Sequence, residues 1–280
     1  MITEEAPWIF VLIGLFFSFF QVLLNIKIFH RHLLLSRVWK KLDFHLIVFR
    51  TVLDIVSGFA NFTLFVVTIR HLLSPDTTSI NYIFAVGINV SNMFILRSCL
   101  AAGIAVERCL ATFFPIGFYN NRKKIPNILI FIIFMMTAIF DDFMLFFYYD
   151  VKFPLNTNCT FYLCTVPRMY WKYATLYAGV YSSIDYFFSF MLICKLLLSK
   201  TKFSSDLRKV NLLCLTDGLS CIMFELIPAI IFSQGIINAL KLGPITGVLR
   251  TTGRVVEAIV MNHLMRKPNP KNSTQVSLKH

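Results

Sequence analysis

The third of seven apolar segments in this chain ends in the stretch Glu107-Arg108-Cys109-Leu110-Ala111-Thr112-Phe113-Phe114-Pro115. Arginine keeps its charge at physiological pH and forms several hydrogen bonds at once. An adjacent acid can therefore hold Arg108 in one state of the protein and release it toward a partner in another. The plainer interpretation is that Glu107 and Arg108 are polar residues at a helix end. Their position at the end of a third segment favours the switch.

The composition indicates a membrane protein. Hydrophobic residues make up 57% of the 280 positions, the mean hydropathy is +0.69, and charged residues make up 15%. Soluble domains carry about 25% charged residues. The chain is therefore expected to lie in lipid, and its length predicts a single domain over residues 1–280.

Seven segments are each near the ~20 residues that a bilayer core requires. They predict membrane-spanning helices over residues 8–29, 44–69, 82–114, 128–147, 173–198, 210–232 and 244–264, followed by a short cytosolic tail over 265–280. The last segment is the weakest because Arg250, Arg254 and Glu257 fall inside it, although Pro244 suits a first helical turn. The sequence thus predicts an all-α membrane protein, a bundle of seven transmembrane helices.

Basic residues are distributed unevenly between the two sides of this layout. The loops after the first, third and fifth segments, together with the tail, carry sixteen Lys and Arg residues, whereas the other side carries five. Because basic loops stay in the cytosol, we expect the amino terminus outside and the carboxy terminus inside, with an uncleaved first span. The net charge of +13 is then mostly a topology signal, and no nucleic-acid partner is expected.

The outside loop between the fourth and fifth segments carries two kinds of candidate modification site. The sequon Asn158-Cys159-Thr160 predicts glycosylation of Asn158. Cys159 and Cys164 share this oxidising side and can form a local disulfide bond. An unpaired or intermolecular role for the two cysteines is the alternative.

Several charged residues fall inside the predicted spans, where an ionised side chain is costly and usually faces the bundle interior. Arg50 and Asp54 are four residues apart, and Arg254 and Glu257 are three apart, so each pair can meet on its own helix. The full set comprises Arg50, Asp54, Arg97, Asp141, Asp142, Asp185, Asp217, Glu225, Arg250, Arg254 and Glu257.

Arg250 has no equally close acid on its own helix and is expected to reach across the bundle, where Asp185 and Glu225 are available. Arg250 and Arg254 lie on one helical face because they are four residues apart. One interpretation is a structural ion pair between helices. The other is a cationic anchor for a ligand carboxylate or hydroxyl-rich head group, with Asp185 or Glu225 holding the arginines in the empty state.

Motifs for other chemistry are missing from the sequence. It contains no His-Glu-x-x-His or Cys-x-x-Cys pair and no Gly-x-Ser-x-Gly elbow. We therefore expect no catalytic residues, no metal site and no cofactor, and a protein that is not an enzyme.

The Glu-Arg stretch and its surroundings carry a family resemblance. The run Gly103 to Ile116, followed by Tyr119-Asn120-Asn121-Arg122 and Ile125-Pro126-Asn127, resembles the nematode serpentine chemoreceptors, most closely the Srbc family. The Glu-Arg pair itself resembles the Asp/Glu-Arg-Tyr signature of rhodopsin-like G-protein-coupled receptors.

The resemblance implies a rhodopsin-like bundle in the plasma membrane of sensory-neuron cilia. It also implies a small environmental or conspecific ligand and a heterotrimeric G protein coupled through Glu107 and Arg108. Two other rhodopsin-like motifs are missing. The sixth segment lacks Cys-Trp-x-Pro, and the seventh lacks Asn-Pro-x-x-Tyr.

Two functions from different classes fit these observations. The first is a chemosensory receptor, which acts alone or as a homo- or hetero-oligomer. The second is a channel or transporter subunit whose buried charges line an ion path. The Glu107-Arg108 pair on the cytosolic side and the odd number of segments favour the receptor.

Overall fold

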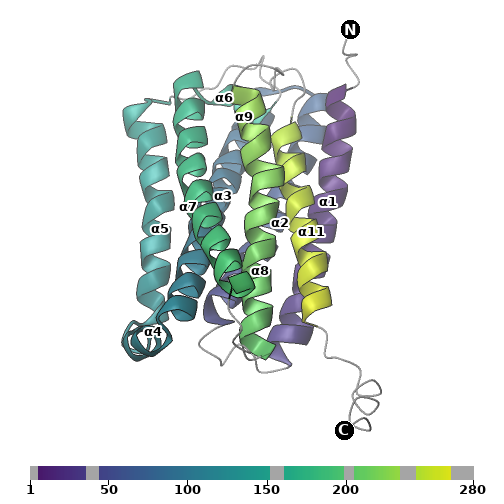
Figure 1. Ribbon diagram of the computed structural model, residues 1–280. Helices are drawn as coiled ribbons and strands as arrows, with labels where there is room; N and C mark the ends of the chain where they lie inside the picture. Colours follow the sequence, from purple (N-terminus) through teal and green to yellow (C-terminus); the bar gives the residue numbers. More distant parts are fainter. Residues whose placement is uncertain (1–5, 36–43, 152–160, 199–204, 234–243, 266–280) are drawn as a thin grey trace.

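The computed structural model describes residues 6–35, 44–151, 161–198, 205–233 and 244–265. Within these residues the chain forms seven long helical rods (Figure 1) and no strand. Four rods are single helices: α2 (His45–Leu73), α3 (Thr77–Phe113), α7 (Arg168–Leu198) and α11 (Ile245–Leu264). Two rods are a helix that ends in a π-helical turn: α1 (Ala6–Ile28) with Phe29–Leu34, and α5 (Asn127–Phe143) with Met144–Tyr148. The remaining rod, between α7 and α11 in the chain, consists of α8 (Ser205–Cys221), a π-helical turn (Ile222–Leu226) and α9 (Ile227–Ser233).

Each predicted span lies on one of these rods, and the rods extend a few residues beyond most of the predicted ends. Five described stretches are long and apolar enough to cross a membrane: Trp8–Leu34, His45–Leu73, Thr78–Phe113, Asn127–Tyr148 and Arg168–Lys195. Their outward faces are apolar. Phe16 and Phe19 on α1, and Ile133 and Phe143 on α5, are all about half exposed in the isolated chain. Such a surface is suited to lipid.

α3 lies at the centre of the bundle, where it packs against α2, α5, α7 and α8. All residues from Ile95 to Ala102 are buried, so this helix is covered on every side there. Its start is set by a capping box in which the Asp76 carboxylate accepts the Ser79 backbone N–H. Hydrogen bonds from Ser79 lower the pKa of the Asp76 carboxyl.

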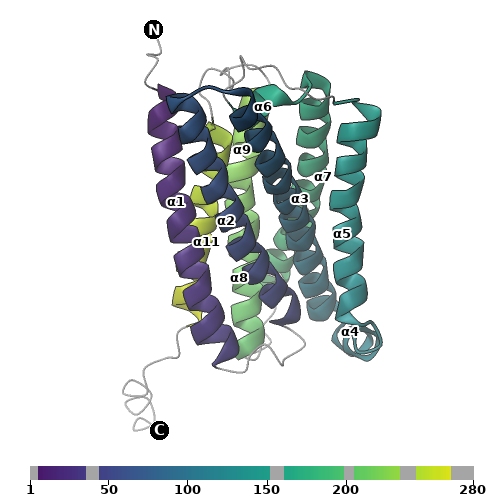
Figure 2. The same ribbon diagram turned by 180° about the vertical axis from the view of Figure 1, so that it is seen from behind.

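Two short helices mark the opposite ends of the bundle. Figures 1 and 2 show α6 (Tyr162–Thr165) at the end where α1 begins, and α4 (Pro115–Arg122) at the end where α11 stops. Pro115 occupies the first turn of α4, where a missing backbone N–H has no cost. The Glu107-Arg108 stretch therefore lies at the α4 end.

Epitope tags at the two termini should show opposite accessibility in intact cells. The basic asymmetry predicts that an amino-terminal tag stains without permeabilisation and that a carboxy-terminal tag stains only after it. Both tagged proteins should stain equally once the cells are permeabilised, which serves as the control. Surface staining of the carboxy-terminal tag would contradict the predicted topology.

Candidate functional site

Four helices bring charged side chains together in the middle of the bundle. Arg97 of α3 is 2% exposed, and its Nη2 atom lies 2.6 Å from Oδ1 of Asp217 on α8. The same atom lies 2.9 Å from Oε2 of Glu257 on α11, and Nε lies 3.0 Å from Oδ1 of Asp54 on α2. Arg50 on α2 also reaches Glu257, with 2.6 Å between Nη2 and Oε2. We call these residues, together with Arg254, the central ion network.

The local pairs predicted from sequence spacing are present within this network. Nε of Arg50 lies 3.7 Å from Oδ2 of Asp54, and Nη1 of Arg254 lies 3.1 Å from Oε1 of Glu257. The contact between Arg50 and Glu257 on another helix is shorter than the local one. Charges buried this deeply persist only when several hydrogen bonds and opposite charges satisfy them. The network therefore ties α2, α3, α8 and α11 together.

Arg254 and Glu225 lie at the edge of the network. The Nη2 group of Arg254 donates to Oε1 of Glu225, which sits on the π-helical turn Ile222–Leu226. Glu225 thus holds Arg254, as predicted for one of the two acids. The expectation that Arg254 borders the ligand cavity does not match the structure, because Arg254 faces its acid partners and is not part of the cavity wall.

Asp185 on α7 does not hold either arginine. It is 1% exposed, and its Oδ1 atom accepts a hydrogen bond from the Ser189 hydroxyl. Among the described residues, no arginine lies within ion-pairing distance of Asp185, and its Oδ2 atom has no hydrogen-bond donor there. Of the two acids expected as alternatives, Glu225 therefore holds Arg254, and Asp185 pairs with neither arginine. The reason is that the three arginines of the network are taken by closer acids.

A cavity of about 540 Å³ lies between α3, α7, the turn Ile222–Leu226, α9 and α11. Its wall includes Ala174 near the start of α7, Ile230 on α9 and Thr246 at the start of α11, so it lies toward the α6 end. Most of the wall is apolar. The hydrogen-bonding groups that line it are Ser91, Thr175, Ser182, Ser183, Glu225, Thr246 and Arg250.

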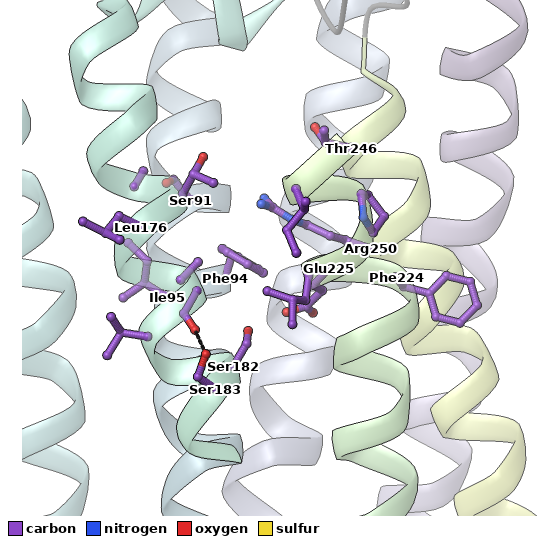
Figure 3. A pocket seen from close by; sticks show the side chains of 18 of the residues that line it. Ser91, Phe94, Ile95, Leu176, Ser182, Ser183, Phe224, Glu225, Thr246 and Arg250 are labelled. Atoms are coloured by element: carbon purple, nitrogen blue, oxygen red, sulfur yellow. Dashed lines mark hydrogen bonds between the residues drawn. The ribbon is translucent and has the colours of Figure 1, made fainter. Parts of the chain in front are cut away.

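Arg250 is the basic residue of this cavity. Figure 3 shows its side chain extending from α11 toward Phe94 of α3, above Glu225. The guanidinium carbon lies 3.6 Å from the centroid of the Phe94 ring, which is a cation–π distance. Within the described part of the chain, no carboxylate forms an ion pair with Arg250, since the Glu225 carboxylate is occupied by Arg254.

The π-helical turn Ile222–Leu226 shapes the wall of the cavity. Pro228 lacks a backbone N–H and cannot bond the carbonyl group four residues earlier, that of Phe224, which favours a locally wider helix. Figure 3 shows Phe224 pointing away from the cavity, and it packs on Gly253 of α11, where an added Cβ would lie 2.9 Å from Phe224 Cβ. This packing leaves the next residue, Glu225, directed at Arg254.

At the α4 end, Glu107 has a closer partner than Arg108. Oε1 of Glu107 lies 2.8 Å from Nε of Arg122 on α4, whereas Oε2 lies 3.6 Å from Nη2 of Arg108. Arg122 also donates to Oδ1 of Asn127, at 2.6 Å, and Asn127 bonds the ring of His45 on α2 at 2.7 Å. Arg108 is 1% exposed. The pair therefore belongs to a larger polar cluster that links α2, α3, α4 and α5.

The sequence did not single out three residues that contribute to the central ion network, the cavity and the polar cluster at the α4 end. Arg97 appears in the sequence only as one of eleven charged residues inside the predicted spans, whereas in the structure it contacts acids from three helices. Phe94 was one of 30 phenylalanines. Arg122 belongs to the run that resembles the Srbc family and to the basic residues that predict the topology, but the sequence predicts no contact of it with Glu107 and does not separate it in this respect from Lys123 and Lys124.

Two predicted sites depend on residues outside the described ranges. Asn158 and Cys159 both lie in 152–160, and Cys164 lies on α6. Glycosylation of Asn158 and the Cys159–Cys164 disulfide bond therefore stay predictions. The described residues contain no group of three or more His, Cys, Asp or Glu side chains that could hold a metal ion.

A bundle of seven helical rods, five of them long and apolar enough to cross a membrane, with a cavity toward one end and a Glu-Arg pair at the other, is the arrangement expected of a seven-helix membrane receptor. Residues 5–269 match the model of the serpentine type seven-transmembrane G-protein-coupled chemoreceptor family Srbc. The chain belongs to this family, so the predicted resemblance and the predicted all-α membrane bundle are confirmed. Srbc is a receptor family and not an enzyme family. No match is found among curated proteins.

Proposed function

We propose that this chemoreceptor binds a small molecule in the cavity between α3, α7, α9 and α11 and signals through a heterotrimeric G protein. The observation that carries this proposal is Arg250, a cation at the cavity wall without an ion-paired acid among the described residues. A cavity of about 540 Å³ is within the usual range for small-molecule sites, roughly 300–1,000 Å³.

Arg250 favours a ligand with a carboxylate or another acceptor-rich group. An ionised side chain inside a membrane bundle normally pairs with an opposite charge, because leaving it unpaired is costly. Glu225 is the acid nearest in the wall, but it already accepts from Arg254. An acceptor group on the ligand would complete the hydrogen bonds of Arg250, and the apolar wall would cover the rest of the molecule.

The central ion network offers a path from the ligand to the α4 end. Glu225 belongs both to the cavity wall and to the network through Arg254. A ligand that displaces Glu225 would change the partners of Arg254 and so the contacts among α2, α3, α8 and α11. We propose that this rearrangement releases Arg108 toward the G protein at the opposite end of α3.

The alternative of a channel or transporter subunit finds less support. In the described residues, Arg50, Arg97 and Arg254 pair with acids of neighbouring helices and do not line the cavity. A current evoked by ligand in the absence of any G protein would favour the channel.

The family also suggests where the receptor works. We infer a plasma-membrane location in nematode sensory-neuron cilia, with the amino terminus and a glycosylated Asn158 outside and the carboxy terminus in the cytosol. Homo- or hetero-oligomers with related chains are part of this proposal. A ligand screen with a G-protein readout, in cells that express the chain alone or with related chains, is the direct test.

Replacing Arg250 with glutamine should weaken the response to an acidic ligand by roughly 10- to 100-fold, the loss expected for a hydrogen bond to a charged group. Surface delivery should stay near normal, since within the described residues no acid forms an ion pair with Arg250 and would be left unpaired. Potency is measured by concentration–response curves for the most active acid from the screen, and surface level by an amino-terminal tag.

Arg254→Gln provides the contrasting variant, because it leaves Glu225 and Glu257 without a shared cation. It should reduce surface delivery as well as response. Unchanged potency of the Arg250→Gln receptor at normal expression would remove the cavity assignment.

A further inference from the structure

The cavity that contains Arg250 is open on one side. Its exposed lining residues, among those described, all lie on two helices: Leu176, Val180, Ser183 and Ile184 on α7, and Ile230 on α9. The described lining residues of α3 and α11 are buried or partly buried. The opening therefore lies between α7 and α9.

This opening lies at the depth of the bilayer core. Leu176 and Ile184 are eight and sixteen residues beyond Arg168, the first residue of α7. At ~1.5 Å per residue they lie about 12 and 24 Å along the helix. The stretch Arg168–Lys195 is apolar enough to cross a membrane. The exposed sides of these residues therefore face lipid, and the opening leads from the cavity into the bilayer.

We call Leu176, Gly179, Val180, Ser183 and Ile230 the rim of the opening. A Cβ added to Gly179 would meet nothing within 4 Å, so the rim has free space at this position. The Ser183 hydroxyl donates to the Gly179 carbonyl oxygen at 2.8 Å and is already satisfied. The other rim side chains are apolar and at least half exposed. A hydrocarbon chain can lie across such a rim without leaving a polar side chain unpaired.

The cationic end of the cavity lies away from the rim. Figure 3 shows Leu176 on the α7 side and Arg250 on the α11 side, with Phe94 between them. The Arg250 guanidinium carbon lies 3.6 Å from the Phe94 ring centroid, and no described acid forms an ion pair with it. The cavity thus joins a cation at one end to lipid at the other, as an amphiphile requires.

We infer that the cavity is filled from the bilayer, through the opening between α7 and α9, by an amphiphile that dissolves in the membrane. Charge complementarity places its acceptor-rich head group at Arg250. The apolar part lies along the wall toward the rim, where a chain longer than the cavity can leave its end in lipid. This inference rests on the proposed function and adds to it the route of the ligand and its lipophilic class.

Photolabelling in vesicles tests the route without an agonist. The full-length chain in phosphatidylcholine vesicles is mixed with palmitic acid that carries a diazirine on its chain, and samples are irradiated at increasing times. Light releases nitrogen and leaves a carbene that inserts into nearby bonds, and peptide mass spectrometry locates the adducts. Ile95 lines the cavity and is 3% exposed, so its adducts report entry. Phe16 on the outward face of α1 reports the acid in the bilayer.

Gly179→Trp should slow labelling of Ile95 roughly tenfold or more, because the indole fills the free space at the rim and passage then requires overpacking. Val180→Trp is a second plug on the same rim. Gly179→Ala should label as the wild type does, and so should Phe187→Trp, which is exposed on α7 outside the described lining. Labelling of Phe16 should be equal in all of these chains.

The methyl ester of the labelled acid tests the head group. At equilibrium it should label Ile95 about tenfold less than the acid, the effect of losing one hydrogen bond to a charged group. Arg250→Gln should remove this difference. Equal labelling by acid and ester in the wild-type chain would overturn the placement of the head group at Arg250.

Labelling of Ile95 at the wild-type rate in both plugged chains would show that the acid enters elsewhere. Adducts on Phe16 without adducts on Ile95 would show that it does not enter. Either result would overturn the route. Because labelling requires no signalling, a chain that labels as expected but responds normally after Arg250→Gln would keep the route and lose the proposed function.

Discussion

Replacing Arg97 with methionine should remove most of the receptor from the cell surface. Arg97 is surrounded by Asp54, Asp217 and Glu257, and its loss would leave three buried carboxylates with fewer positive charges than they need. Breaking one side of a buried ion pair costs about 3–5 kcal/mol. That is a large part of the stability of a typical domain, about 5–15 kcal/mol. Surface staining and the thermal stability of the solubilised protein are the measurements.

A second substitution distinguishes charge from packing. Adding Asp217→Asn to the Arg97→Met chain should recover part of the surface level, because it removes one of the acids left unpaired. A packing defect alone would not be rescued in this way. Arg70→Met, at an exposed position near the end of α2, is the matched control and should leave delivery unchanged. Wild-type stability of the Arg97→Met chain would show that the central ion network does not hold the helices together.

Arg108→Ala should abolish coupling to the G protein. In the described state Arg108 is 1% exposed and lies beside Glu107, so it can meet a cytosolic partner only after the α4 end of the bundle rearranges. If that rearrangement exposes Arg108 to the G protein, removal of the guanidinium leaves nothing to replace its hydrogen bonds, and signalling falls to background. Nucleotide exchange on the G protein, with and without agonist, is the readout.

Two variants make this test specific. Arg108→Gln keeps a polar side chain in the buried position, so a loss of coupling at normal surface level cannot be ascribed to misfolding. Lys123→Ala removes an exposed basic residue from the same end of the bundle and should signal normally. Full signalling by both Arg108 variants would remove the main argument for a rhodopsin-like mechanism.

Arg250 and Arg254 show what residue spacing along one helix can predict about side-chain contacts and what it cannot. Four-residue spacing correctly predicts that both leave α11 on one side, yet the two side chains serve different sites. Arg254 is drawn to Glu225 by a π-helical turn on a different rod, and Arg250 is left over Phe94. The irregular turn follows from Pro228, but its effect on Glu225 depends on the packing of Phe224 against α11.

Glu107 and Arg108 also show a difference between the contact that the sequence predicts and the contact that the fold adds. Adjacent positions suggested that Glu107 holds Arg108, and the two do lie 3.6 Å apart. The shorter 2.8 Å contact of Glu107 is with Arg122, because the turn at Phe114 and the helix α4 bring that residue back to the end of α3. Sequence distance alone does not distinguish Arg122 from the two lysines that follow it.

The sequence by itself determined the helical membrane bundle, the position of its seven helical rods, the family and the local pairs Arg50–Asp54 and Arg254–Glu257. These features follow from the length of each apolar segment and from the 3.6-residue period of one helix, and both can be read from neighbouring positions in the sequence. Only the tertiary structure decided that Arg97 has three acids around it, that Asp185 pairs with no arginine among the described residues, and that Tyr162 packs on Gly87. Those contacts join residues far apart in sequence, and they depend on how the helices are rotated and packed, which no short-range pattern encodes.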